Sequence, residues 1–116
     1  QLWEAAGVSP AGNWYKEAGQ GMGAVITMTN DIQGYTLADR GTYIAMRDKI
    51  DLEVLFDGDP ALFNPYGIIA VNPDRHPHVN YEGAMALVKW ITSEQGQTLI
   101  DKFRKGGDQL FYPDAM

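Results

Sequence analysis

A nearly continuous apolar run at residues 66–71 limits the folds open to this sequence more than any other feature. Runs of this kind are typical of strands that a sheet buries on both faces, as happens where helices cover a mostly parallel sheet. Two further apolar runs, at residues 35–38 and 52–56, alternate with segments of helical periodicity. The sequence therefore predicts an α/β fold.

Spacing of apolar residues predicts four helices, over residues 21–33, 40–49, 81–92 and from Ser93 to about residue 103. Gly34 is expected to end the first and the Gly106–Gly107 pair the last, while Asn80 is expected to cap the third. For the second helix Asp39 is the expected N-cap. The alternative is a cap at Thr36, with Asp39 completing a capping box.

Both ends of the sequence carry short elements. Residues 1–7 are read as the last turns of a helix that Gly7 stops, which predicts that the chain is part of a longer protein. Residues 110–112 are expected to be a last short strand or an extended tail. The Pro, Gly and Asp content of residues 57–65 is typical of a link between two lobes.

Composition excludes several classes of function. The 116 residues carry 9 Lys and Arg against 15 Asp and Glu, a net charge of −6, which argues against nucleic-acid binding. Without cysteine there is no disulfide, thiolate nucleophile or cysteine metal site. The serines lack a nucleophile motif, and His76 and His78 have no evident third ligand, so neither an enzyme nor a metal site is predicted.

Three glycines, Gly19, Gly21 and Gly23, precede or open the first predicted helix. A helix start presents unpaired N–H groups and the positive end of the helix dipole, and glycines let an anion approach them closely. The alternative is a flexible loop that simply leads into a helix. Thr36 and Arg40 offer a hydroxyl and a cation at a second turn, although Arg40 could instead pair with the neighbouring Asp39.

The last third of the chain resembles the C-terminal helix pair of the extracytoplasmic solute-binding proteins of ABC importers. Residues 83–103 carry their pattern of a tryptophan and isoleucine, a capping serine, and Gly-Gln before the final isoleucine and phenylalanine. More narrowly, four stretches are similar to the tungstate-binding protein family: residues 14–23, 35–43, 63–73 and 76–84. The resemblance covers nearly all of the sequence.

This resemblance implies an incomplete two-lobe fold like that of type II periplasmic binding proteins. Residues 1–58 would belong to lobe II as its ligand-facing helix–strand–helix part, residues 59–65 would be the hinge, and residues 66–116 would return into lobe I. The implied function is high-affinity binding of tungstate, with molybdate as a second ligand, for delivery to an ABC permease. The protein would be exported to the periplasm or cell exterior, it would need no cofactor, and its missing N-terminal half or a dimer partner would complete the fold.

Related molybdate-binding proteins hold their oxyanion at a helix start and on the strand that follows. Mapped onto this chain, the resemblance places the contacts at Gly21 or Met22 and at Thr36 or Leu37, with Arg40 as a further candidate. The alternative ligands are other oxyanions, such as phosphate or sulfate. The alternative role is the effector-sensing domain of a transcription regulator with the same fold.

Overall fold

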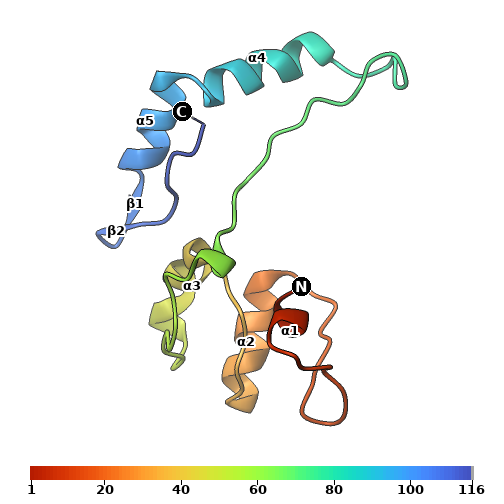
Figure 1. The fold of residues 1–116 in the computed structure, drawn as a ribbon. Coiled ribbons are helices and arrows are strands. Elements are labelled where there is room, and N and C mark those ends of the chain that lie inside the picture. The colour runs from red at the N-terminus through yellow and green to blue at the C-terminus, as the bar shows by residue number, and fades with distance from the viewer. Residues whose placement is uncertain (116) are drawn as a thin grey trace. The chain divides into compact units, whose positions relative to one another are not determined.

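Two units, Gln1–Phe63 and Asn64–Met116, make up the chain in the computed structural model, which describes residues 1–115 (Figure 1). The first unit holds three α-helices and two short 3-10 helices. In chain order they are α1 (Leu2–Ala5), α2 (Met22–Ile32), α3 (Arg40–Met46), η1 (Arg47–Lys49) and η2 (Pro60–Leu62). The predicted helix end at the start of the sequence is confirmed: α1 is followed by Gly7, whose φ of 66° is left-handed.

The core of the first unit lies where α2 and α3 pack together. Ile26 of α2 is 1% exposed and Ile44 of α3 is 8% exposed, while Thr29 and Gly41 are buried beside them. The Thr29 hydroxyl is satisfied within its own helix, because it donates to the Val25 carbonyl at 2.7 Å. Burial of two isoleucines makes this a small core.

The end of α2 differs from the expectation. The left-handed residue is Gln33, with φ 52°, and the glycine that was expected to stop the helix, Gly34, does not have a positive φ. The Gly34 N–H instead donates to the Thr29 carbonyl at 2.9 Å, and the Gln33 side chain donates to the Asn30 carbonyl. These bonds satisfy carbonyls of the last turn, which offsets the cost of a left-handed non-glycine residue.

The N-cap of α3 is Asp39, one of the two residues that the sequence offered. Its carboxylate accepts from the backbone N–H of Thr42 at 2.8 Å and from the Thr42 hydroxyl at 2.8 Å, so the alternative cap at Thr36 is wrong. Replacing Asp39 with Ala removes these bonds, and we expect the free energy of unfolding to fall by about 1–2 kcal/mol. Urea denaturation measures this. Thr36→Val is the matched control, and an equal loss in both variants would contradict the cap assignment.

The second unit contains two helices and a hairpin: α4 (Tyr81–Ile91), α5 (Glu94–Lys102), β1 (Arg104–Lys105) and β2 (Asp108–Gln109). Both predicted caps are confirmed, since Asn80 accepts from the Gly83 N–H and Ser93 accepts from the Gly96 N–H. The antiparallel hairpin was not predicted. Gly106 and Gly107 form its two-residue turn with φ of 56° and 85°, and do not end α5 as expected. A Gly-Gly pair is a known signal for such a turn.

Gln97 joins the corner between α4 and α5 to the C-terminal segment. Its side chain is buried, donates to the Ile91 carbonyl at 2.7 Å, and accepts from the N–H groups of Asp114 and Ala115 at 3.0 Å. Leu110 is buried in the same unit, within residues 110–112, which form no strand. The tail of the described chain is therefore held by a side chain 17 residues earlier.

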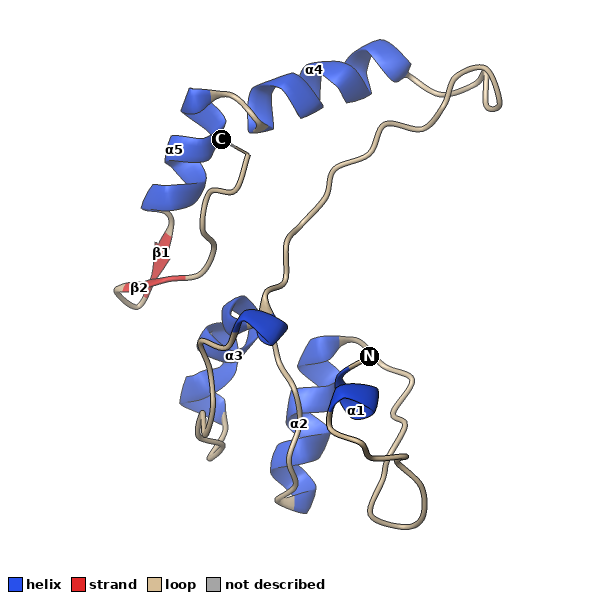
Figure 2. Ribbon diagram, in the orientation of Figure 1, coloured by secondary structure: helices blue, strands red, loops and turns tan. Residues whose placement is uncertain are grey.

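The strands predicted at residues 35–38, 52–56 and 66–71 are not paired in the structure. Figure 2 shows these residues as loop, and the described residues contain no sheet beyond β1 and β2. Their apolar side chains are correspondingly open to solvent: Ile69 is 89% exposed and Leu55 73%. A strand is stable only when neighbouring strands accept its backbone hydrogen bonds, and residues 1–115 supply no neighbours for these three.

No helix among the described residues is long and apolar enough to span a bilayer.

Candidate functional site

The start of α2 has the properties expected of an anion-binding helix end. Gly21 is the N-cap, with φ −67° and ψ 165°; no side chain caps the helix, and its first turn contains no acidic residue. The first intrahelical bond is that from the Val25 N–H to the Gly21 carbonyl, at 3.1 Å, so the N–H groups that precede Val25 have no partner within the helix. Donors and the positive dipole end remain available there.

Open space surrounds this helix start. A Cβ placed on Gly21 or on Gly19 would meet no heavy atom within 4 Å. Gly19 has a φ of 60°, which other residues rarely adopt, so the loop needs a glycine at this position. Gly23 differs, because its added Cβ would lie 3.6 Å from the Met46 sulfur of α3. An added Cβ at Gly23 would therefore make an ordinary van der Waals contact with α3, whereas Gly19 and Gly21 leave the approach clear.

Helices α2 and α3 begin at the same end of the first unit (Figure 1). The far end of α2 lies beside the residues after η1, because the Asp51 N–H donates to the Asn30 side chain at 2.8 Å. Arg40 is the first residue of α3 and therefore lies at the end of the unit where α2 begins.

Thr36 and Leu37 lie in the segment that returns from the end of α2 to the start of α3. Both are exposed, and the Thr36 hydroxyl donates only to the neighbouring Leu37 carbonyl, at 3.3 Å. Figure 1 shows this segment running back toward the end where α2 and α3 begin. The hydroxyl has no other hydrogen-bond partner among residues 1–115, so it is available to a ligand.

The pairing of Arg40 with Asp39, which the sequence offered as an alternative, is not present. The Arg40 guanidinium lies 3.3 Å from the carboxylate of Asp57, and Asp39 is used as the cap of α3. Asp57 lies within residues 57–65, whose composition predicts a link between lobes, and its pairing with Arg40 was not predicted. The two residues are 17 positions apart, and no local pattern reveals such a contact.

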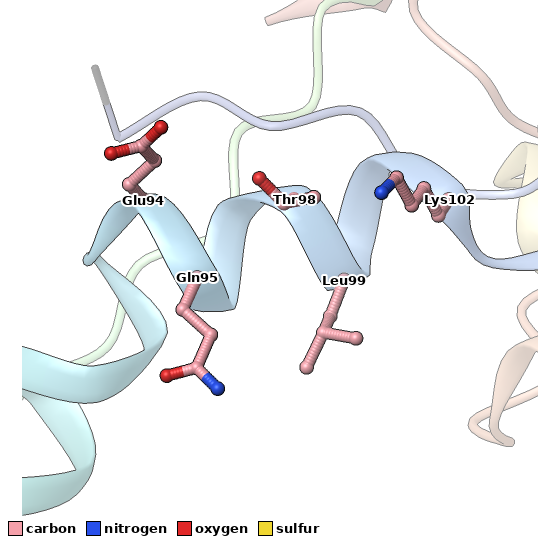
Figure 3. A pocket seen from close by; sticks show the side chains of 5 residues that line it. All are labelled: Glu94, Gln95, Thr98, Leu99 and Lys102. Carbon is pink, nitrogen blue, oxygen red and sulfur yellow. The ribbon is translucent and has the colours of Figure 1, made fainter.

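Other candidate sites are weaker. The His76 and His78 rings lie 6.1 Å apart, but the described residues contain no group of three or more side chains that could hold a metal ion. The surface depression in Figure 3, about 350 Å³, is lined by five residues of α5 alone: Glu94, Gln95, Thr98, Leu99 and Lys102. Their side chains extend outward from one helix and do not converge, so they enclose no ligand.

An apolar groove of about 300 Å³ lies on the second unit. Its lining is almost wholly hydrophobic: Trp90, Ile91, Gly96, Leu99, Ile100, Phe103 and Phe111. It offers too few polar groups to orient a small hydrophilic ligand. This groove is therefore not a candidate oxyanion site.

Comparison with known proteins identifies the family. Residues 1–95 match the family model described as "PBP superfamily domain". The chain is 46% identical over 116 residues to the tungstate-binding protein of Peptoclostridium acidaminophilum, and 38% identical over 119 residues to that of Campylobacter jejuni. These matches use 98% of this chain in both cases but only 41% and 44% of the relatives. The chain thus spans less than half the length of these relatives.

A solved structure agrees with this result. The tungstate ABC transporter structure from Geobacter sulfurreducens is 55% identical to the chain, with a TM-score of 0.78, over 88% of this chain and 43% of that one. The two curated relatives are named as binding proteins. The predicted fold class is confirmed, and the chain belongs to the PBP superfamily domain family.

Proposed function

We propose that this chain forms part of a binding protein that captures tungstate and delivers it to the permease of an ABC importer. The observation that carries the proposal is the uncapped, glycine-flanked start of α2 in a chain similar to tungstate-binding proteins. Molybdate is the second ligand to test, because it is also a tetrahedral dianion. Binding would take place outside the cytoplasm, in the periplasm or at the cell exterior.

The proposed contacts come from backbone and side chain together. The N–H groups of Gly21 and Met22 would bind the oxyanion, and Thr36, Leu37 and Arg40 would form the second wall. Hydrogen bonds to a charged acceptor are about twice as strong as neutral ones, so a few donors suffice in a site that excludes water. The net charge of −6 does not oppose this, since charges beyond about 10 Å are screened at ordinary salt.

The proposed organisation follows the longer relatives. Residues 1–58 would belong to the ligand-facing lobe, residues 59–65 would act as the hinge, and residues 66–116 would return into the other lobe. In this arrangement the unpaired segment 66–71 gains strand neighbours from the remainder of the complete protein or from a dimer partner. Its exposed apolar side chains support this assignment.

The test removes a single backbone donor without disturbing the helix. Met22 is the first residue of α2, where proline is well tolerated, and the ψ of 165° at Gly21 suits the residue before a proline. In the complete protein that carries this chain, we expect Met22→Pro to weaken tungstate binding about 10- to 100-fold, the effect of one hydrogen bond to a charged group. Isothermal titration calorimetry measures the change.

Met22→Ala is the matched control, because it shortens the side chain and keeps the N–H. We expect its affinity to remain within about two-fold of the parent protein. Unchanged affinity in a folded Met22→Pro variant would remove this N–H from the site. Failure of the parent protein to bind either tungstate or molybdate would refute the proposed function itself.

A further inference from the structure

Arg40, one of the proposed oxyanion contacts, forms an ion pair with Asp57, which lies 17 residues later in the chain. One guanidinium nitrogen of Arg40 lies 3.3 Å from one carboxylate oxygen of Asp57. The two side chains are 51% and 64% exposed, and among residues 1–115 neither has another hydrogen-bond or ion-pair partner. A single exposed contact of this kind is weak, because water competes for both charges.

The fold brings Asp57 to Arg40 by a defined route. After η1 the chain turns beside the end of α2 and runs back along α3, where the Tyr43 hydroxyl donates to the Leu52 carbonyl at 3.1 Å. Five residues later the same segment reaches Asp57, at the start of α3. Asp57 therefore lies at the end of the unit where α2 also begins (Figure 1).

Most of the hydrogen-bonding capacity of Arg40 is unused. A guanidinium has five N–H donors in a planar fork, and Asp57 engages it at one nitrogen only. A tetrahedral dianion can accept two parallel bonds from such a fork, which is a stronger contact than the observed one. Because the exposed pair is weak, an oxyanion that enters the site can replace Asp57 as the partner of Arg40.

We infer that Asp57 competes with the bound oxyanion for Arg40 and so sets the affinity of the site; this inference rests on the proposed function. While the pair is intact, Asp57 neutralises Arg40. In the bound state Arg40 turns to the oxyanion, and the Asp57 carboxylate moves away from the like-charged ligand. Asp57 is therefore an affinity-determining residue that does not itself contact the ligand.

The experiment is a double-mutant cycle on tungstate affinity in the complete protein, measured by isothermal titration calorimetry. We expect Asp57→Asn to tighten binding about two- to five-fold, because a competitor of the strength of an exposed ion pair is removed. Arg40→Ala is expected to weaken binding about 10-fold, and Asp57→Asn should have no further effect in the Arg40→Ala background. Glu53→Gln is the charge-matched control: it lies on the same segment, is exposed, and should change affinity less than Asp57→Asn.

The outcomes separate this inference from the function on which it rests. If Met22→Pro loses affinity while Arg40→Ala does not, the oxyanion site stands and the role of Arg40 and Asp57 is refuted. Weaker binding in Asp57→Asn would also refute the inference, since it would mean that Asp57 supports Arg40 in the bound state. If Glu53→Gln and Asp57→Asn tighten tungstate binding equally, the effect comes from long-range charge and not from the pairing of Asp57 with Arg40, which refutes the inference. If the parent protein does not bind tungstate or molybdate, both the function and the inference fail.

Discussion

Replacing Gly21 with Asp is expected to weaken tungstate binding at least 100-fold in the complete protein while leaving the fold intact. An Asp at the N-cap accepts hydrogen bonds from the N–H groups of the first turn, the same donors that the proposed site offers to the oxyanion. Its charge also repels a dianion at short range. At a separation of about 4 Å and an effective dielectric constant of about 20, one pair of like charges costs roughly 4 kcal/mol.

The Gly21→Asp variant is expected to be at least as stable as the parent protein. Capping residues such as Asp exceed Gly by only a few tenths of a kcal/mol, so the melting temperature should be equal or slightly higher. The backbone at Gly21 permits the substitution, because φ is −67° and an added Cβ meets nothing within 4 Å. A loss of binding accompanied by unchanged stability would therefore report on the site and not on the fold.

Two further substitutions separate the causes of the loss. Gly21→Ala adds a Cβ but no acceptor, and we expect its affinity to remain close to that of the parent protein. Gly21→Asn caps the helix without a charge, and we expect an intermediate affinity. If Gly21→Asp binds tungstate as tightly as the parent protein in calorimetry, the start of α2 is not where the oxyanion binds.

Replacing Gly96 with Ala is expected to be the most destabilising single change in the second unit. Gly96 lies in the first turn of α5, at the corner with α4. A Cβ there would be 2.8 Å from the Ile91 Cα and still closer to the Trp90 carbonyl oxygen, and both neighbours are backbone atoms that cannot rotate away. Overpacking of this kind costs about 3 kcal/mol, and the two helices would have to separate.

Urea denaturation followed by circular dichroism measures this cost. With a slope of roughly 1.5–2 kcal/mol per molar urea, the midpoint should fall by about 1.5–2 M. Gly67→Ala is the matched control in the same unit, since Gly67 does not have a positive φ and an added Cβ there meets nothing within 4 Å. We expect its midpoint to change little. Equal stability of the Gly96→Ala variant and the parent would contradict the packing of α4 on α5.

The helices of this chain could be predicted from sequence because their signals are local. Asn80 and Ser93 cap helices within three residues of themselves, and the apolar spacing that defines α2 and α4 is contained in each helix. The glycines before Met22 likewise marked a helix start with free donors. These features depend on backbone geometry over one or two turns, so no distant residue is needed to recognise them.

Only the tertiary structure decided which residues far apart in the sequence contact each other. Two contacts join separate segments: the pairing of Arg40 with Asp57, and the hydrogen bonds that the Gln97 side chain accepts from the N–H groups of residues 114 and 115. The apolar run at residues 66–71 shows what happens when such contacts are missing. Its composition favours a buried strand, yet a strand also needs hydrogen-bonding neighbours, and residues 1–115 provide none. Sequence therefore determined the helices and the glycine-flanked start of α2, and tertiary structure determined which strands pair and which side chains meet, because such contacts depend on the path of the whole chain.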